Sequence, residues 1–242
     1  MIGDQTTTEE TRRRIAANIA SVRATIAEAA RRVGRQPEKI TLVAVSKTMP
    51  LALVQIAYNE GVTDFGENRV QDALPKIAAL HPPGLRWHMI GHVQTNKAHK
   101  VAEDFDAVQS VDSLHLAEIL NRYAGARDKP LPILLQVNVS GEASKEGMTP
   151  EETPALARQI ATLPGLTVQG LMTIAPLAHS PEEARPTFRG LRLLSEQLQQ
   201  AVPEIAWQHL SMGMTDDYVI AIEEGATIVR VGRAIFGERV HR

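Results

Sequence analysis

The chain has 242 residues, 43% of them apolar and only 4% aromatic, a composition that predicts one large α/β domain with an aliphatic core. Its 26 basic and 28 acidic side chains leave a net charge of -2, which excludes a general electrostatic attraction to nucleic acid or to an anionic membrane. Without cysteine there is no disulfide or thiolate metal site, and without a signal peptide or an apolar run of roughly 20 residues we expect a cytoplasmic protein.

The first predicted element is a long helix from Thr8 to Arg32, which precedes any strand. Apolar side chains recur in it at helical spacing, as at Ile15, Ile19 and Val22, and Gly34 follows its end. We therefore expect this helix as an addition in front of the first repeat of the fold.

After this helix, short apolar runs alternate with helical patterns along the whole chain. The runs that predict strands are Ile40–Ser46, Asp64–Gly66, Arg86–Ile90, Ala107–Val111, Ile133–Val139, Val168–Ile174, Trp207–Leu210 and Thr227–Val231. The helical patterns between them cover Pro50–Glu60, Arg69–Leu80, Thr95–Ala102, Ser113–Tyr123, Pro150–Thr162, Pro181–Gln200 and Asp216–Glu224. This alternation predicts a single (β/α)8 TIM barrel domain over residues 1–242. The alternative is an open doubly wound sheet, which would normally carry a glycine-rich turn after the first strand, where this chain reads Ser46-Lys47-Thr48-Met49-Pro50.

Polar residues gather where the predicted strands end, which is where barrels carry their chemistry. Lys47 directly follows the first strand, and Asn68 follows the second. A lysine partly removed from water has a lowered pKa, and its neutral amine can condense with an aldehyde to form a Schiff base. The competing interpretation of Lys47 is an ammonium group that reaches solvent or pairs with a carboxylate.

Two segments near the end of the chain together predict a phosphate site. Ser211–Asp217 combines hydroxyl groups with Gly213 ahead of a helix, where backbone N–H groups favour an anion. The last strand leads into Val231-Gly232-Arg233, and a glycine there lets the backbone come close to a ligand. Loops after strands seven and eight of a barrel often form a phosphate cup. Simple helix capping by Thr215 or Asp216 is the alternative for the first segment.

Arg230 and two histidines stand out within apolar strands. An inward-facing Arg230 needs a ligand or a buried partner, and a carboxylate from the second strand is the alternative to a ligand. His88 and His92, four residues apart, would share one face of a strand, but the sequence offers no evident third ligand. We therefore expect hydrogen-bonded imidazoles and no metal site.

Several of these segments resemble the signature blocks of a known family. They are Val43–Thr48, Phe65–Gln71, Trp87–Lys97, Gly170–Ile174, Ser211–Thr215 and Arg230–Gly237, and the match runs from about Ile15 to Gly237. On these blocks the chain is similar to the YggS/PROSC family, the pyridoxal phosphate homeostasis proteins. The resemblance implies a fold-type III protein that binds pyridoxal 5'-phosphate (PLP), with a barrel similar to the barrel domain of alanine racemase.

The resemblance also implies roles for individual residues. It implies that Lys47 forms the Schiff base with PLP, that Asn68 lies near the cofactor and that Arg230 faces the pyridine nitrogen. The implied phosphate site consists of Ser211 and the backbone around Met214, Thr215, Gly232 and Arg233. Many members of the family have Thr where this chain has Arg233, so the arginine either strengthens phosphate binding or points away from it.

Three functions fit these residues. The first is a PLP-binding carrier or regulator in vitamin B6 and amino-acid homeostasis, which passes PLP to apo-enzymes. The second is a PLP-dependent amino-acid racemase, which needs an acid or base on each face of its substrate. The third is a Schiff-base aldolase that uses Lys47 without PLP and takes a sugar phosphate at the phosphate segments.

The resemblance favours the carrier. A cationic Arg230 beside the pyridine nitrogen disfavours its protonation and so weakens PLP as an electron sink. In alanine racemase one base is a tyrosine from a β-rich second domain of the partner subunit, whereas this chain ends at Arg242 and its tyrosines Tyr58, Tyr123 and Tyr218 all fall in predicted helices. We therefore expect a monomer with no established turnover.

Overall fold

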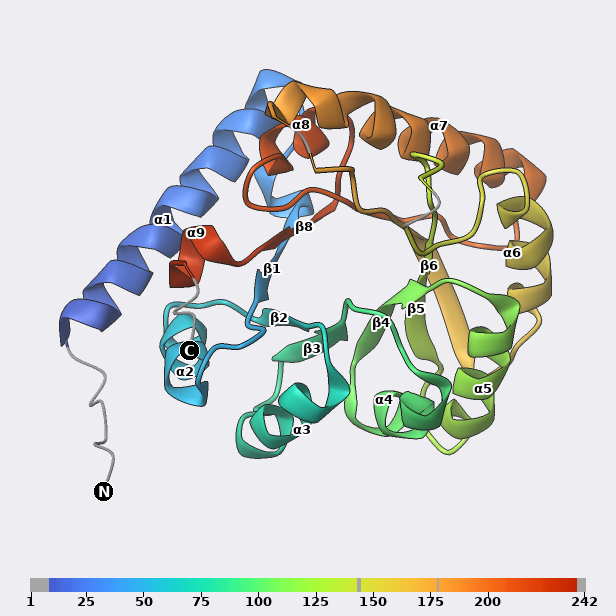
Figure 1. Cartoon of the computed structure of the whole chain (residues 1–242), viewed down its shortest axis with the longest axis horizontal. Coiled ribbons are helices and arrows are strands. Elements are labelled where there is room, and N and C mark those ends of the chain that lie inside the picture. Colours follow the sequence, from blue (N-terminus) through green and yellow to red (C-terminus); the bar gives the residue numbers. More distant parts are fainter. Residues whose placement is uncertain (1–8, 143–144, 178, 239–242) are drawn as a thin grey trace.

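The computed structural model describes residues 9–142, 145–177 and 179–238, and these form a closed barrel of parallel strands wrapped by helices (Figure 1). The strands pair in chain order, and β8 (Ile228–Val231) pairs with β1 (Thr41–Val45), which closes the ring. The predicted (β/α)8 barrel is confirmed. The alternative of an open doubly wound sheet is wrong, because an open sheet has two unpaired edge strands and this ring has none among the described strands.

The strands are short and mostly buried, as parallel strands covered on both sides should be. Between β1 and β8 they are β2 (Asp64–Glu67), β3 (Arg86–Met89), β4 (Ala107–Val111), β5 (Leu131–Gln136), β6 (Leu166–Met172) and β7 (His209–Ser211). The seventh strand begins two residues later than predicted, at His209 instead of Trp207. Its pairing explains the shift, because Gly170 lies opposite His209 with φ of 152°, and a side chain at Gly170 would collide with the His209 carbonyl oxygen.

Helices connect the strands and cover the outside of the barrel (Figure 1). The α-helices are α1 (Glu9–Arg32), α2 (Leu51–Asn59), α3 (Val70–Ala79), α4 (Ala98–Asp104), α5 (Leu114–Ala124), α6 (Thr153–Ala161), α7 (Arg185–Ala201), α8 (Tyr218–Glu223) and α9 (Arg233–Phe236). Short 3-10 turns form η1 (Pro37–Lys39), η2 (Thr95–Lys97) and η3 (Pro181–Ala184). The helices predicted from Thr95 and Pro181 thus begin as 3-10 turns, and α9 was not predicted.

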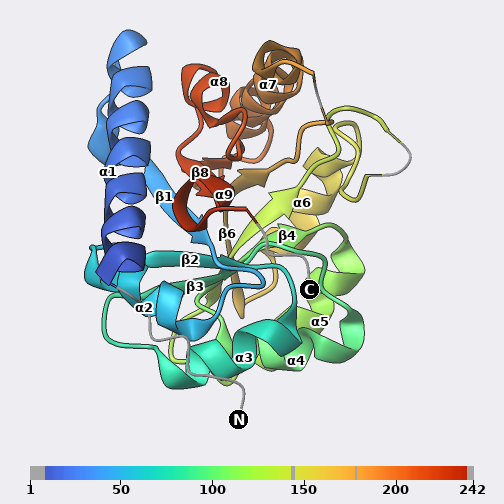
Figure 2. The same ribbon diagram turned by 60° about the vertical axis from the view of Figure 1, so that its left-hand side comes forward.

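The predicted N-terminal helix is present as α1, which lies outside the barrel against α8, α9 and α2 (Figures 1 and 2). Its apolar stripe is buried, and polar side chains tie it to the end of the barrel. Asn18 donates a hydrogen bond to the Ile235 carbonyl at 2.9 Å, and Arg35, just beyond the helix, donates to the Ile222 carbonyl at 2.8 Å. Thr8, the predicted first residue of this helix, lies outside the described residues.

The apolar core has two parts. A large cluster fills the layer between the strands and the helices, and a small cluster of Val43, Leu134, Met172 and Ile228 lies apart from it. These four residues come from β1, β5, β6 and β8, and we assign them to the interior of the ring, where branched and long aliphatic side chains fill a barrel. Among the described residues, no helix has the length and apolar character that crossing a membrane requires.

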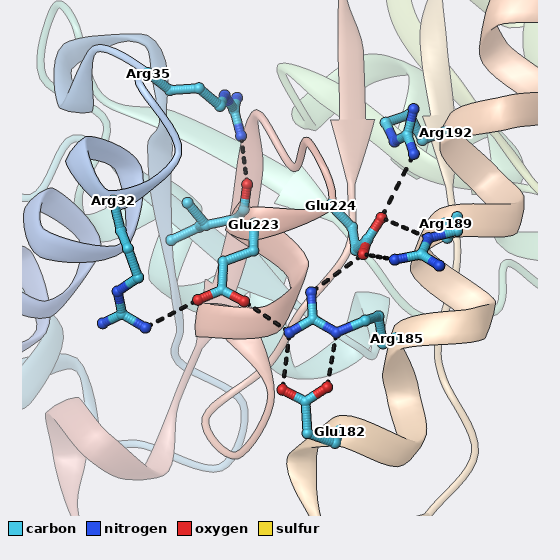
Figure 3. A network of polar contacts seen from close by, with 9 residues as sticks. Arg32, Arg35, Glu182, Arg185, Arg189, Arg192, Glu223 and Glu224 are labelled. Carbon is cyan, nitrogen blue, oxygen red and sulfur yellow. Dashed lines mark hydrogen bonds and ion pairs between the residues drawn. The ribbon is translucent and has the colours of Figure 1, made fainter.

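A network of arginines and glutamates joins α1, η3, α7 and α8 on the outside (Figure 3). Its centre is Glu224, a buried carboxylate just after α8, whose oxygens pair with Arg185 at 3.1 Å and Arg189 at 2.9 Å. Glu223 beside it pairs with Arg185 and with Arg32 of α1. The network therefore links the N-terminal helix to the last two helical repeats.

Candidate functional site

The predicted site residues lie at the carboxyl ends of four neighbouring strands. Because β7 pairs with β8, β8 with β1 and β1 with β2, the residues that follow these strands meet on one side of the barrel mouth. The segments concerned are Ser211–Thr215, Arg230–Arg233, Lys47 and Asn68. Residues 180 positions apart in the sequence are thus gathered by the closure of the ring, since a chain with an open sheet would leave β1 and β8 apart.

Lys47 follows β1 and is half-buried, and the chain turns sharply after it. Thr48 has φ of 65°, in the left-handed region that β-branched residues rarely adopt. Such backbone strain costs on the order of 1–3 kcal/mol and clusters at functional sites. The turn takes the backbone out of the strand directly after the lysine that the sequence singled out.

A buried clamp fixes the peptide that precedes Lys47. Glu67, which is fully buried at the end of β2, accepts hydrogen bonds from Ser46 Oγ at 2.6 Å and from Lys76 Nζ at 2.8 Å. Lys76 also donates to the Ser46 carbonyl oxygen at 2.7 Å. The three side chains hold the end of β1 against β2 and α3, so that the base of the Lys47 side chain starts from a fixed position.

Two buried oxygens beside this clamp have no hydrogen-bond partner among the described residues, Glu67 Oε2 and Asn68 Oδ1. A buried acceptor without a donor is costly, and such atoms in a native fold call for an explanation such as a ligand. Asn68 is also tightly packed, because a side chain at Gly91 would come within 2.3 Å of the Asn68 carbonyl oxygen. The backbone of Asn68 is therefore closely packed against Gly91, while its amide oxygen has no hydrogen-bond partner among the described residues.

The two predicted phosphate segments are bound to each other. The Arg230 backbone N–H donates to the Gly213 carbonyl at 3.0 Å, and Gly213 has φ of 92°, which favours glycine. The Met214 N–H, which lies ahead of α8, donates to the Asp217 carboxylate at 2.6 Å, and burial raises the pKa of Asp217. Asp217 is the N-cap residue of α8 and its side chain makes no capping hydrogen bond, so the alternative of helix capping by Thr215 or Asp216 is wrong.

Arg233 links the same two segments through its side chain. It begins α9 directly after Gly232 and forms a short ion pair with Asp216 of the β7–α8 loop. The guanidinium is half-exposed, so its charge lies at the surface of the mouth. The sequence left two roles for Arg233, stronger phosphate binding or a side chain that points away. In the structure the side chain contacts the Asp216 carboxylate and thereby links the loop after β8 to the loop after β7.

Arg230 is buried inside the barrel with 3% of its surface exposed. It donates to Ser211 Oγ at 2.6 Å and to the Thr173 carbonyl oxygen at 2.8 Å. The alternative of an ion pair with a carboxylate from the second strand is wrong, because the β2 carboxylates Asp64 and Glu67 are bound to other side chains. Burial lowers the pKa of Arg230 to about 10, so the group stays cationic at neutral pH.

His88 and His92 do not share one site. His88, within β3, contacts Asp64 and Gln109, whereas His92 lies beyond the strand end. His92 Nδ1 is 3.3 Å from Asp112 and 3.4 Å from Glu146, so two carboxylates that are distant in the sequence converge on it. The expectation of packed or hydrogen-bonded imidazoles is confirmed for His88. His92 is half-exposed, and the expectation that no further ligand lies near it is wrong.

Two further residues of the site were not singled out from the sequence: Lys76 and Gln109. Lys76 had a signal, since it interrupts the buried apolar face of α3 between Ala73 and Ile77. Gln109 had a weaker one, as a polar residue in the apolar strand β4. Their roles depend on contacts across the barrel, which spacing along the chain cannot predict.

The comparisons with known proteins match this geometry to a family. The family model described as "Alanine racemase, N-terminal domain" covers residues 14–240. The chain is 48% identical to the pyridoxal phosphate homeostasis protein of Pseudomonas aeruginosa, over 93% of this chain and 96% of that protein. The chain belongs to the family of pyridoxal phosphate homeostasis proteins. The relative of the same name in Escherichia coli is 42% identical over 93% of this chain and 97% of its own length.

Solved structures agree with the sequence match. PipY of Synechococcus elongatus, in a structure with PLP bound, is 39% identical and superposes with a TM-score of 0.82 over 92% of this chain and all of that chain. An alanine racemase of Clostridium difficile superposes with a TM-score of 0.74 at 16% identity, over 96% of this chain and 61% of that chain. The second likeness concerns the fold alone, and it confirms the predicted similarity to the alanine racemase barrel.

Proposed function

We propose that this chain binds PLP as a Schiff base on Lys47 and acts as a PLP carrier or regulator in vitamin B6 and amino-acid homeostasis. The observation that carries the proposal is the PLP-bound structure of PipY, whose fold this chain shares at 39% identity. The strand-end position of Lys47, beside a strained turn and a buried clamp, supports the same assignment. The unit that performs this role is the barrel of residues 1–242 as one domain.

The residues around Lys47 fit the cofactor. Bound PLP would supply an aldehyde for the lysine amine, an aromatic ring and a phosphate. Asn68 offers a buried acceptor that has no partner among the described residues, and Arg230 offers a buried cation for the ring nitrogen. Because an arginine disfavours protonation of that nitrogen, the site suits holding PLP better than stabilising a carbanion.

The phosphate would lie between the loops after β7 and β8, at Ser211, Met214, Thr215, Gly232 and Arg233. The contacts between these loops support the assignment, since they give the site a fixed shape before the ligand arrives. The Arg233–Asp216 pair adds a positive group at the rim of this site. A phosphate would either displace Asp216 from the Arg233 guanidinium or bind the guanidinium while Asp216 stays in contact with it.

The test is reduction of the PLP-loaded protein with borohydride, followed by peptide mapping. The purified protein should be yellow, and the reduced cofactor should be found on Lys47. Lys47→Ala should lose both the colour and the covalent label, whereas Lys100→Ala, at an exposed lysine paired with Glu103, should keep both. A Lys47→Ala protein with unchanged PLP spectrum and retention would contradict the proposal. A colourless protein that cannot be reconstituted would favour the PLP-free aldolase.

The recipients of PLP would be apo-enzymes, and we infer that the carrier works as a cytoplasmic monomer. A transfer assay tests the first part. PLP-loaded protein is mixed with an apo-PLP enzyme in the presence of a scavenger for free PLP. Activation of the apo-enzyme that survives the scavenger supports direct transfer, whereas activation abolished by the scavenger reduces the role to storage.

A further inference from the structure

A chain of buried side chains crosses the barrel from the proposed cofactor site to the opposite end. Arg230 of β8 donates to Ser211 Oγ of β7 at 2.6 Å, and Ser211 Oγ donates to Gln109 Oε1 of β4 at 2.6 Å. Gln109 Nε2 lies 3.1 Å from His88 Nδ1 of β3, and His88 Nε2 lies 2.8 Å from Asp64 Oδ1 of β2. We call these five residues the relay.

The relay is an interior feature and not a surface network. Each of its members has at most 6% of its surface exposed. Since β4 and β7 are not neighbours in the ring, the bond between Ser211 and Gln109 spans the interior of the barrel. At the far end Asp64 accepts a second contact from Arg86, whose side chain is half-exposed, at 2.8 Å. A cavity of about 130 Å³ there is lined by His88 and Gln109.

The orientation of the Gln109 amide, with Oε1 toward Ser211 and Nε2 toward His88, sets the direction of the other bonds in the relay. A guanidinium only donates, so the hydroxyl of Ser211 accepts from Arg230 and must send its own hydrogen to Gln109 Oε1. The amide nitrogen of Gln109 then donates to His88 Nδ1, which must carry a lone pair. His88 therefore holds its single proton on Nε2 and donates to the Asp64 carboxylate. Burial acts to raise the pKa of Asp64, but the hydrogen bonds from His88 and Arg86 and the charge of Arg86 outweigh it and the pKa is lowered, so Asp64 is the ionised acceptor that the His88 Nε2–H needs.

We propose that Gln109 and His88 are positioning residues of the cofactor site, which set the hydrogen-bonding direction of Ser211 and thereby orient Arg230. The inference rests on the proposed function, because it takes Arg230 to be a cofactor-binding residue. An apolar interior would fill this space at a lower desolvation cost, so the polar relay is retained at an energetic disadvantage. Its gain is that Ser211 has one hydrogen-bonding state and Arg230 one orientation.

The relay itself is tested without cofactor by 15N NMR of the histidine side chains. In the cofactor-free protein, His88 should be neutral with a pyridine-type Nδ1, and the His88→Gln spectrum assigns its signals. Gln109→Glu should convert His88 to the doubly protonated imidazolium, because a carboxylate oxygen cannot face a lone pair on Nδ1. Gln136→Leu, at a buried glutamine of β5 outside the relay, should leave His88 unchanged.

The link to the cofactor is tested by PLP titration and by the absorption spectrum of the bound cofactor. Gln109→Leu, which leaves Ser211 without its acceptor, should raise the PLP dissociation constant about tenfold and shift the absorption maximum. Gln136→Leu should do neither. If Gln109→Leu does not fold, Gln109→Glu answers the same question, since its altered His88 should also change the bound spectrum.

The outcomes separate the two proposals. A wild-type His88 that is already an imidazolium, or that carries its proton on Nδ1, overturns the relay. Gln109 variants with unchanged PLP affinity and spectrum overturn the positioning role even where the relay exists. A wild-type protein that binds no PLP fails the proposed function, while the NMR experiment still decides the state of His88 by itself.

Discussion

Arg230 shows how a single residue can be costly for folding and useful for binding. Its guanidinium is buried and bound to a hydroxyl and a carbonyl, and no carboxylate among the described residues accepts a hydrogen bond from it. Burial penalises the charge and lowers the pKa of the group to about 10, below that of an arginine in the unfolded chain. As the pH rises from the folded pKa toward the unfolded one, the unfolded chain therefore binds more protons than the folded one, and stability should rise.

We predict that Arg230→Met stabilises the cofactor-free protein while it weakens PLP binding. Replacing a poorly compensated buried charge by an apolar side chain of similar length should raise the free energy of unfolding by about 1–3 kcal/mol. Urea denaturation of the cofactor-free protein measures this change. Arg13→Met, at an arginine with 77% of its side chain exposed, should change it by less than about 0.5 kcal/mol. A less stable Arg230→Met protein would show that the charge contributes to folding.

At this scale the sequence allowed the positions of site residues to be predicted better than their partners. Lys47, Asn68 and Ser211 could be placed at the mouth because they follow strands. The partners of Arg230 could not, since the bonds from β8 to Ser211 of β7 and to Thr173 just beyond β6 depend on the geometry of the closed ring. The ion pair between Arg233 and Asp216 could not be predicted for the same reason.

At the scale of elements, α8 is held by its buried apolar face and by ion pairs at its end. It is a short helix, and its last turn leads into Glu223 and Glu224, which the arginines of α7 and α1 contact (Figure 3). The α8 helix follows the loop of Gly213–Asp217, so its attachment to α7 also fixes one wall of the proposed phosphate site. The sequence predicted this helix, but the pairing of its end with two other helices depends on packing between distant repeats.

We predict that Glu224→Gln lowers the free energy of unfolding by about 2 kcal/mol, since it removes one charge from a buried position whose arginine partners are partly exposed. Glu182→Gln, with 64% of its side chain exposed, should cost well below 1 kcal/mol. Denaturant unfolding at neutral pH compares the two. Equal losses would mean that burial of Glu224 has no part in the effect.

The ion pairs of Glu224 also predict that the stability of the protein depends on pH in the acidic range. Burial acts to raise the pKa of Glu224, but hydrogen bonds and charges from Arg189 and Arg185 outweigh it and the pKa lies below 4.5 in the folded protein. The contribution to stability is therefore complete above pH 4.5 and is lost as the pH falls through the folded pKa. Between pH 5 and pH 3 the difference in unfolding free energy between wild type and Glu224→Gln should shrink. A constant difference would contradict the assignment.

At the scale of the whole molecule, the closed ring and the position of the candidate site both depend on the pairing of β8 with β1. That pairing was predictable from eight repeats of strand and helix, and it alone brings Lys47 to the loops after β7 and β8. The boundaries were less predictable, because the start of β7 and the 3-10 turns ahead of α4 and α7 depend on local backbone pairing. The relay was not predictable at all, since it requires β4 and β7 to face each other across the interior.

The arrangement of the barrel also bears on the choice between carrier and racemase. Racemisation needs an acid or base on both faces of the substrate carbon. Tyr58 and Tyr123 lie in the last turns of α2 and α5, toward the end of the barrel opposite the mouth, and Tyr218 is buried at the start of α8. With Lys47 as the base on one face, we predict that PLP-loaded protein incubated with L-alanine in deuterated water shows slow exchange of the Cα hydrogen, and that exchanged alanine stays L. Proton NMR and chiral chromatography measure both, with D-alanine as the mirror-image control. Racemised product that disappears in Tyr218→Phe would establish Tyr218 as the opposing group and the racemase as the correct alternative.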